Sequence, residues 1–246
     1  MENDTLRLLR KIHCSAMAEA YRKQMEDPSR YDGMTFDERL ACLVQYENDV
    51  RDSNHLKRLL KQAGFVYPSA SLGGIKYLPD RHLDKDLIRM LGTNNYVLSH
   101  QNIAIIGATG SGKTYLANAL GVNACQNGCK VKYIRLPDLF ADFRAADQEK
   151  KRKDYLRKCQ NVAVLIIDEF LLYTTTAEQQ QILLEIMERR VEHASTIVCS
   201  QYAPAGWTER LGNSVVADAI MDRLLSNAYT IQIDGKVSMR VRRTEE

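Results

Sequence analysis

Apolar positions repeat at helical spacing through the first quarter of the chain. Four apolar side chains step by three, three and four residues and so line one helix face, namely Leu6, Leu9, Ile12 and Ala16. Pro28 and Gly33 interrupt the pattern. The helical period then resumes from Phe36 to Ala63, a stretch without Gly or Pro. The pattern predicts an N-terminal helical domain over residues 1–66.

Local signals mark both ends of the long predicted helix. Thr35 and Glu38 have the spacing of a capping box, in which two side chains satisfy backbone N–H groups at the helix start. Gly64 directly follows the helix and suits a C-terminal cap. Gly and Pro then punctuate the chain up to residue 80, which is the composition of a linker. We therefore assign residues 67–99 to a linker and a lead-in helix.

A different hydrophobic pattern begins near residue 100. Short, almost continuous apolar runs recur there with helical stretches between them: Ile103–Ile106, Val131–Ile134, Val162–Ile167, Thr196–Cys199 and Tyr229–Ile233. Near-continuous apolar strands that alternate with helices are typical of a parallel sheet covered on both faces. The sequence predicts an α/β fold over residues 100–246, with a parallel five-stranded sheet flanked by helices.

The composition allows one substantial core and a small accessory domain, because 45% of the 246 residues are hydrophobic. No apolar run approaches the roughly 20 residues that cross a bilayer, and the N-terminus has no signal-peptide pattern. We therefore expect a cytoplasmic protein without a membrane partner. The six cysteines are scattered, so we expect reduced thiols that serve as small core residues.

Basic residues cluster locally although the overall charge is nearly balanced. The net charge of +3, from 34 Lys+Arg and 31 Asp+Glu, does not by itself indicate nucleic-acid binding. The basic residues gather in three places: Lys57, Arg58 and Lys61; the run from Lys150 to Lys158; and Arg240, Arg242 and Arg243. Such patches can contact DNA phosphates, although each one alone is more often a solvated face.

One segment carries the signature of a phosphate-binding loop. Its residues fit G-x-x-x-x-G-K-[ST] in full: Gly107, Ala108, Thr109, Gly110, Ser111, Gly112, Lys113 and Thr114. The motif follows the apolar run that ends at Ile106 and precedes a predicted helix over Tyr115–Asn123. In this setting backbone N–H groups cradle the phosphates of ATP and Lys113 reaches the β- and γ-phosphates, while the Thr114 hydroxyl ligates Mg²⁺. A merely structural glycine turn would need neither side chain.

Two acids end a buried apolar run. Asp168 and Glu169 follow Val162–Ile167, at the end of the strand where parallel sheets bind ligands. Asp168 would hold Mg²⁺, and Glu169 would polarise the attacking water. Strands often end in acids, but this pair comes one strand–helix unit after the phosphate loop. The pair therefore favours ATP hydrolysis.

The run Thr196–Cys199 also ends in polar residues, Ser200 and Gln201. If its strand lies beside the acidic strand, either side chain could touch the γ-phosphate or the water. Ordinary polarity at a strand end explains both residues equally well.

A predicted helix over Ala217–Leu224 carries Arg223 exposed near its end. This arginine could reach the nucleotide of a neighbouring subunit. The alternative is a salt bridge within the helix, to Asp222 or Asp218, and the sequence alone does not decide between them.

Several blocks of residues are similar to those of one family. The most specific are Phe36-x-Glu38-Arg39-Leu40, Gln101-Asn102 and Ala217-Asp218-Ala219-Ile220-x-Asp222-Arg223-Leu224. Further blocks, shared more widely, include Gly107–Leu120, Val164–Glu169 and Thr196–Gln201. With these residues nearly the whole chain resembles the IstB-like ATP-binding proteins, helper ATPases of bacterial insertion sequences in the AAA+ class. Close relatives of that family are the DnaC-like helicase loaders.

The resemblance implies a P-loop NTPase of AAA+ type that forms a homo-oligomer on double-stranded DNA. It also implies a partner transposase of the integrase type, whose action and target choice the ATPase promotes. Gln201, with Ser200 as the alternative, matches the sensor-1 position, and Arg223 matches the arginine-finger position. Arg240 lies where a late basic residue recurs.

The chain departs from the family pattern in one place. It reads Leu72-Gly73-Gly74-Ile75 where relatives tend to carry acidic residues, which bears on contacts between the domains. The sequence stops at Glu246, soon after the last predicted strand. We therefore expect no helical lid, a more exposed ATP and a site that neighbouring subunits complete.

The leading hypothesis is an ATPase that binds DNA and serves a transposase in transposition and DNA recombination. A DnaC-like replicative helicase loader is the alternative, with the same ATP chemistry but a hexameric helicase as partner. A small-molecule kinase is a third possibility, although it would not need Glu169 beside Asp168. No N-K-x-D motif is present to read guanine, which disfavours a GTPase.

Overall fold

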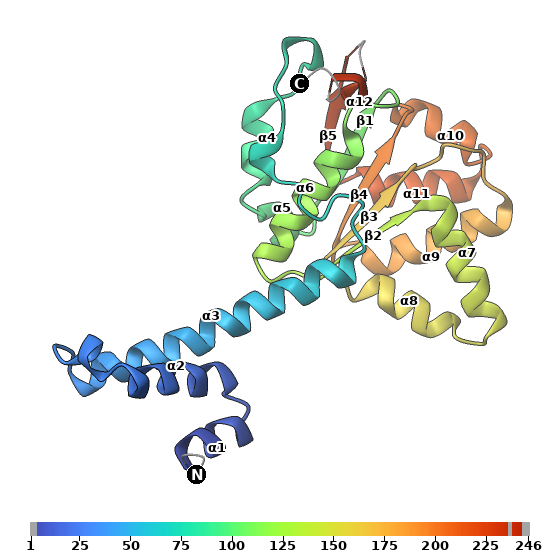
Figure 1. Ribbon diagram of the computed structural model, residues 1–246. Coiled ribbons are helices and arrows are strands. Elements are labelled where there is room, and N and C mark those ends of the chain that lie inside the picture. Colours follow the sequence, from blue (N-terminus) through green and yellow to red (C-terminus); the bar gives the residue numbers. More distant parts are fainter. Residues whose placement is uncertain (1–3, 236–237, 243–246) are drawn as a thin grey trace. The chain divides into compact units, whose positions relative to one another are not determined.

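The computed structural model describes residues 4–235 and 238–242 (Figure 1). Its contacts group into two compact units, Met1–Arg58 and Leu59–Glu246, and the division falls within helix α3 (Phe36–Ala63). The domain boundaries expected from the sequence, 1–66 and 67–99, stay predictions. Among the described residues, no helix is both long enough and apolar enough to span a bilayer.

From residue 4 onward, the first unit is built from helices joined by short turns. It contains α1 (Asp4–Lys11), α2 (Ser15–Glu26), the 3-10 turn η1 (Pro28–Tyr31) and the first part of α3. The expected capping box begins α3: Thr35 N–H donates to Glu38 Oε2 at 2.7 Å, and Glu38 N–H donates to Thr35 Oγ1 at 3.3 Å. Gly64 follows α3 with φ of +73°, a left-handed value that glycine adopts without strain.

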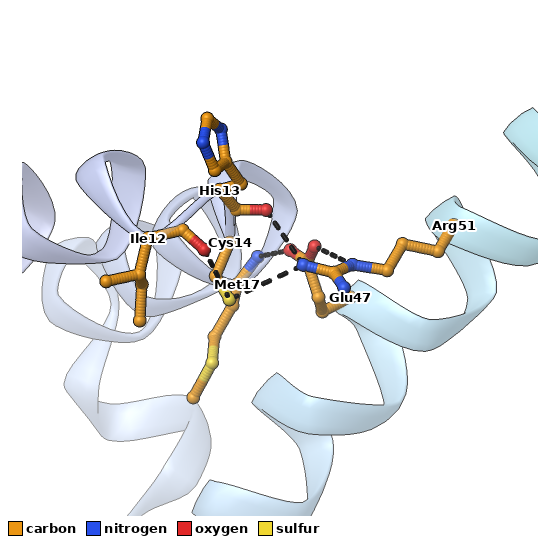
Figure 2. A network of polar contacts seen from close by, with 6 residues as sticks. All are labelled: Ile12, His13, Cys14, Met17, Glu47 and Arg51. Atoms are coloured by element: carbon orange, nitrogen blue, oxygen red, sulfur yellow. Dashed lines mark hydrogen bonds and ion pairs between the residues drawn. The ribbon is translucent and has the colours of Figure 1, made fainter.

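A polar network ties α2 to α3 within this unit (Figure 2). Cys14 precedes α2 but its side chain caps no N–H group of the helix. Glu47 of α3 takes that role, because its Oε2 accepts the Met17 N–H at 2.8 Å. Arg51 donates to Glu47 Oε1 at 2.7 Å and to the His13 carbonyl at 2.8 Å. The start of α2 is thus capped by a carboxylate from another helix.

A parallel five-stranded sheet forms the centre of the second unit, as the sequence predicted. Its strands are β1 (Asn102–Gly107), β2 (Val131–Arg135), β3 (Val164–Asp168), β4 (Ser195–Ser200) and β5 (Ala228–Ile233). They lie in the order β2-β3-β4-β1-β5, and every pair is parallel. The strand order places the end of β1 and the end of β3 on either side of β4.

Helices cover both faces of the sheet (Figure 1). Leu165 and Ile167 of β3 belong to a core that they share with helices α7 to α11. Ile166 points to the other face, since a Cβ on Gly121 of α6 would lie 2.8 Å from Ile166 Cδ1. The helices of this unit, after the last turns of α3, are α4 (Lys85–Leu91), α5 (Asn95–Leu98), α6 (Lys113–Gln126), α7 (Leu136–Gln148), α8 (Arg152–Gln160), α9 (Ala177–Arg190), α10 (Trp207–Arg210), α11 (Val215–Leu225) and α12 (Met239–Arg242).

The segment between α3 and α4, residues 64–84, is called the lead-in segment below. Its composition predicted a linker, but the structure packs it along α6. The Tyr67 N–H donates to Asn118 Oδ1 at 3.0 Å, and Asn118 is fully buried. Gly121 leaves room for the Phe65 ring, which a Cβ would approach to 2.6 Å. These contacts bring the lead-in segment to the helix that begins at the phosphate loop.

Candidate nucleotide-binding site

The phosphate loop joins β1 to α6, as its motif predicted. β1 ends at Gly107 and α6 begins at Lys113. Two glycines adopt left-handed backbone conformations, with φ of +79° at Gly110 and +98° at Gly112. A side chain is excluded at Gly107 for another reason, since its Cβ would collide with the Ile233 carbonyl of β5. The glycines of the motif are therefore required by backbone geometry, and the loop directs the start of α6 at the site.

Lys113 points into this loop. Its Nζ donates to the carbonyls of Gly107 at 2.6 Å and Ala108 at 2.8 Å. The side chain is buried, and burial lowers the pKa of Lys113 while the nearby Asp168 opposes that shift. A cation held by two neutral carbonyls in a buried loop can exchange them for the oxygens of a phosphate, which would also satisfy its charge.

Asp168, the last residue of β3, lies directly beside the start of α6. Its Oδ2 accepts two hydroxyl donors, Thr114 Oγ1 at 2.7 Å and the Tyr133 OH at 2.8 Å. Its Oδ1 accepts the Glu169 N–H at 2.8 Å. Burial, reinforced by Asp168, raises the pKa of Tyr133, so its phenol stays a donor at neutral pH. Sequence reasoning placed Thr114 and Asp168 together but missed Tyr133.

Glu169 follows β3 in a left-handed backbone conformation, with φ of +53°. Its side chain is 38% exposed and forms an ion pair with Arg135, at 3.2 Å between Nε and Oε2. The same Nε lies 3.5 Å from Oδ2 of Asp138. Arg135 ends β2 opposite Asp168 in the strand register. No sequence pattern predicts this contact, because it depends on which strand lies next to β3.

The residues present fit a magnesium ion. A hydroxyl and a carboxylate, Thr114 and Asp168, meet at the start of α6 and supply the oxygen ligands that Mg²⁺ takes together with phosphate oxygens and water. Within residues 4–235 and 238–242, no cluster of three or more His, Cys, Asp or Glu side chains offers a metal site made by protein alone. The donor set is that of a metal bound with a nucleotide.

A pocket adjoins the phosphate loop on the side of the lead-in segment. The residues that line it are Tyr67, Gly74, Ile75, Lys76, Arg81, Gly110, Gly112, Lys113, Thr114, Tyr115, Leu116 and Met239. Arg81 is buried and donates to the Ser111 carbonyl at 2.8 Å. In the same pocket, the Met239 N–H donates to the Gly110 carbonyl at 2.9 Å. The loop is thus held by two segments that the motif does not include.

The two candidates at the end of β4 differ. Ser200 is buried, and its hydroxyl donates to the Phe170 carbonyl at 2.9 Å and accepts the Trp207 Nε1–H at 3.1 Å. The expectation that Ser200 could touch phosphate or water is therefore wrong, since its hydroxyl is committed to the core. Gln201 is exposed beyond the strand end. β4 lies beside β3, as that expectation required, and the role of Gln201 stays a prediction.

Arg223 is half-buried rather than exposed. Its Nη2 pairs with Glu188 Oε1 of α9 at 3.0 Å, and its Nη1 donates to the Ala219 carbonyl at 3.0 Å. The alternative of an ion pair within the helix, to Asp218 or Asp222, is therefore wrong, since the partner Glu188 lies on α9. The Arg223 carbonyl accepts from the Asn102 side chain at 3.2 Å, at the start of β1. Arg223 therefore lies at the sheet edge opposite the phosphate loop of its own subunit.

Several charges of the basic run are paired within the chain. Lys151 pairs with Glu149 at 2.7 Å, Arg152 with Glu185 at 2.6 Å, and Arg157 with Asp154 at 3.9 Å. Such pairing reduces the positive potential that the run alone suggested. The side chain of Arg240, and Arg243 as a whole, lie outside the described residues.

All six cysteines are free thiols, as expected, and three of them, Cys125, Cys159 and Cys199, are buried. These three serve as small core residues. Cys14 and Cys129 are half-buried, and Cys42 is exposed.

A phosphate loop between β1 and α6, with an acid pair at the end of strand β3 of the same parallel sheet, defines a P-loop nucleotide-binding protein. Comparison with known proteins agrees. The family described as IstB-like ATP binding protein matches residues 7–246. The chain belongs to this family.

Curated relatives are named for insertion sequences. The insertion sequence ATP-binding protein y4uH of Sinorhizobium fredii is 32% identical over 246 residues, which cover 100% of this chain and 98% of that protein. The IS1162 ATP-binding protein of Pseudomonas fluorescens is 35% identical over 201 residues, covering 82% and 87% of the two chains.

Solved structures with the same fold come from replication proteins. The DnaC helicase loader has a TM-score of 0.58 and 19% identity, covering 68% of this chain and 98% of that one. AMPPCP-bound DnaA from Aquifex aeolicus has a TM-score of 0.60 and 20% identity, covering 73% and 54%. This chain thus spans about half the length of that DnaA chain. At these identities the likeness shows the fold alone, and it confirms the predicted fold class.

Proposed function

We propose that the protein hydrolyses ATP and acts as the helper of a transposase on duplex DNA. The observation that carries the ATPase part is the 2.7 Å contact between Thr114 and Asp168. It joins the phosphate loop to the acidic strand end, with Glu169 as the next residue. A kinase would use Thr114 and Asp168 but has no need of the second carboxylate, that of Glu169.

Each residue has a distinct role in the proposed reaction. The N–H groups of the loop and the Lys113 ammonium would hold the phosphates, and Thr114 and Asp168 would hold Mg²⁺, which neutralises phosphate charge when it is bound. Glu169 would accept the proton of the attacking water. Gln201 would orient that water or the γ-phosphate. The polarity of each side chain supports its proposed role.

Arg223 lies beside the start of β1, whereas the phosphate loop follows the end of β1, so Arg223 is too far from the nucleotide site of its own subunit to act there. We propose that it serves the nucleotide of a neighbour in a homo-oligomer, which needs its ion pair with Glu188 to open. A cation brought to the phosphates at an interface would couple hydrolysis to assembly.

The DNA and transposase parts of the proposal are supported by the family, whose curated relatives are insertion sequence proteins. DNA contacts would be made mainly to phosphates and would weaken with salt. A cytoplasmic location suits such work. The DnaC-like fold fits a helicase loader equally well in its ATPase domain, so the partner must be found by experiment.

A turnover assay tests the proposal. We expect Mg²⁺-dependent release of phosphate from ATP, stimulated by duplex DNA and less so at high salt. Lys113→Ala should abolish nucleotide binding, and Glu169→Gln should keep binding but stop turnover. Stimulation by a small hydroxyl compound with transfer of phosphate to it would instead show a kinase. Stimulation by a replicative helicase but not by a transposase would show a loader.

A further inference from the structure

Tyr133 is a buried tyrosine of β2 whose hydroxyl reaches the acidic strand. β2 lies beside β3, and Tyr133 is level with Ile166, two residues before Asp168. The ring is 8% exposed, and its OH donates to Asp168 Oδ2 at 2.8 Å. No sequence motif pointed to this residue.

We propose that Tyr133 is a positioning residue that fixes the Asp168 carboxylate for binding the Mg²⁺ of the nucleotide. The inference rests on the proposed function, because it assigns a second residue to the same site. The hydroxyl of Tyr133 has this role, while its ring is part of the buried core.

The donors around Asp168 explain why one hydroxyl can decide its orientation. A carboxylate rotates about its bond to Cβ unless both oxygens are held. The Glu169 N–H holds Oδ1, while Oδ2 is held by Thr114 and Tyr133 together. Thr114 belongs to the phosphate loop and is itself a proposed metal ligand, so its hydroxyl must also serve the metal. Tyr133 is the side-chain donor to Asp168 that comes from outside the loop.

Burial increases the effect that loss of the hydrogen bond from Tyr133 to Asp168 has on the carboxylate. Asp168 is 5% exposed, so water cannot readily replace a donor that is lost. Hydrogen bonds to charged groups are stronger than hydrogen bonds between neutral groups. Loss of the phenol should therefore weaken metal binding to the carboxylate by about tenfold, a factor that an equilibrium titration resolves easily.

The test is a magnesium titration of nucleotide binding, read from a fluorescent, non-hydrolysable ATP analogue. In the full chain, Tyr133→Phe removes only the hydroxyl and should raise the half-saturating Mg²⁺ concentration about tenfold. Binding of the analogue in EDTA should not change. Tyr155→Phe is the matched control: Tyr155 is 9% exposed and its OH donates to a carbonyl of the core, Leu139, at 3.3 Å. It should leave the titration unchanged.

A second variant separates positioning from packing. If Tyr133 acts through the carboxylate, Tyr133→Phe should have no further effect on the magnesium titration once Asp168→Asn is present. An unchanged magnesium midpoint in Tyr133→Phe, or an equal loss of binding with and without Mg²⁺, overturns the role of Tyr133. If the unaltered protein shows no magnesium-dependent binding at all, the proposed function falls as well, and the two failures are distinguished by that measurement.

Discussion

Arg135 and Glu169 form an ion pair across two neighbouring strands of the sheet, with 3.2 Å between Nε and Oε2. The pair engages the carboxylate that the proposed reaction needs as a base. A carboxylate oxygen held by a guanidinium is less available to accept a proton from water. The resting subunit thus keeps its proposed base partly occupied.

Arg135→Ala should therefore raise hydrolysis in the absence of DNA. Both side chains are more than one-third exposed, and such ion pairs are worth about 0.2–1 kcal/mol, so we expect an increase of at most about fivefold. The KM for ATP should stay the same, because Arg135 does not line the phosphate loop. Arg144→Ala is the control, since Arg144 pairs with Glu178 at 3.1 Å with similar exposure. A fall in rate for Arg135→Ala would mean that Arg135 supports the base instead.

The Glu188–Arg223 pair should limit any action of Arg223 on a neighbouring subunit. Glu188→Gln removes the partner charge and should free the Arg223 side chain. We expect half-maximal hydrolysis at a protein concentration up to about fivefold lower, the most that a partly exposed pair can hold back. Arg223→Ala should bind ATP normally but lose the dependence of the rate on protein concentration. If the hydrolysis rate depends on protein concentration in the same way for the unaltered protein, Glu188→Gln and Arg223→Ala, Arg223 has no role at an interface.

Gly74 should be required by the packing of the lead-in segment on α6. A Cβ at Gly74 would overlap the Tyr115 hydroxyl, whereas the next ring atom, Cζ, would lie 3.5 Å away, an ordinary contact. Gly74→Ala should therefore cost about 1–3 kcal/mol of stability and weaken nucleotide binding, because both residues line the pocket.

Tyr115→Phe should restore much of that loss in the double variant, since it removes the overlapping atom. Gly73→Ala is the adjacent control, where a Cβ would meet nothing within 4 Å. Thermal unfolding and the affinity for an ATP analogue measure both effects. Additive losses in the double variant would show that the overlap is not the cause.

Glu47 should make the first unit sensitive to acid. Burial acts to raise the pKa of Glu47, but the Met17 N–H and Arg51 outweigh it, so the pKa lies below the usual 4.5. A carboxylate with a lowered pKa in the folded state adds stability above its unfolded pKa, and this is lost as pH falls through the folded value. Glu47→Gln should thus destabilise α2 by about 1 kcal/mol near pH 6, with the difference vanishing in acid.

Hydrogen exchange of the Met17 amide in the full chain, between pH 6 and pH 3, measures this difference. Glu19→Gln is the control, because Glu19 is exposed and pairs with Lys23 on its own helix. A difference between Glu47→Gln and the unaltered protein that persists unchanged at pH 3 would contradict the assignment.

Features that depend on local backbone geometry were predictable from sequence. The capping box at Thr35 needs only two residues three apart, and the phosphate loop needs glycines where the backbone is left-handed. Buried strands show as apolar runs because both faces of each strand are covered. The acid pair could be placed at the site because parallel strands end at one edge.

Contacts between distant segments could not be predicted in this way. The partner of Arg223 proved to be Glu188 of another helix, where the sequence had suggested Asp218 or Asp222. The Ser200 hydroxyl is bonded to Phe170 and Trp207 in the core, where the expected strand order had suggested the γ-phosphate or the water. Composition marked residues 64–80 as a linker, because Gly and Pro are as frequent in a packed, irregular segment as in a free one.

The sequence by itself determined the order of the elements, the class of fold and the identity of the phosphate loop and its acids. Those depend on periodicity and backbone conformation, which neighbouring residues set. Only the tertiary structure decided that Tyr133 and Arg135 of β2 hold Asp168, which ends β3, and Glu169, which follows it. That outcome follows from strand order and register, and these are fixed by burial of the whole sheet and not by any local run of residues.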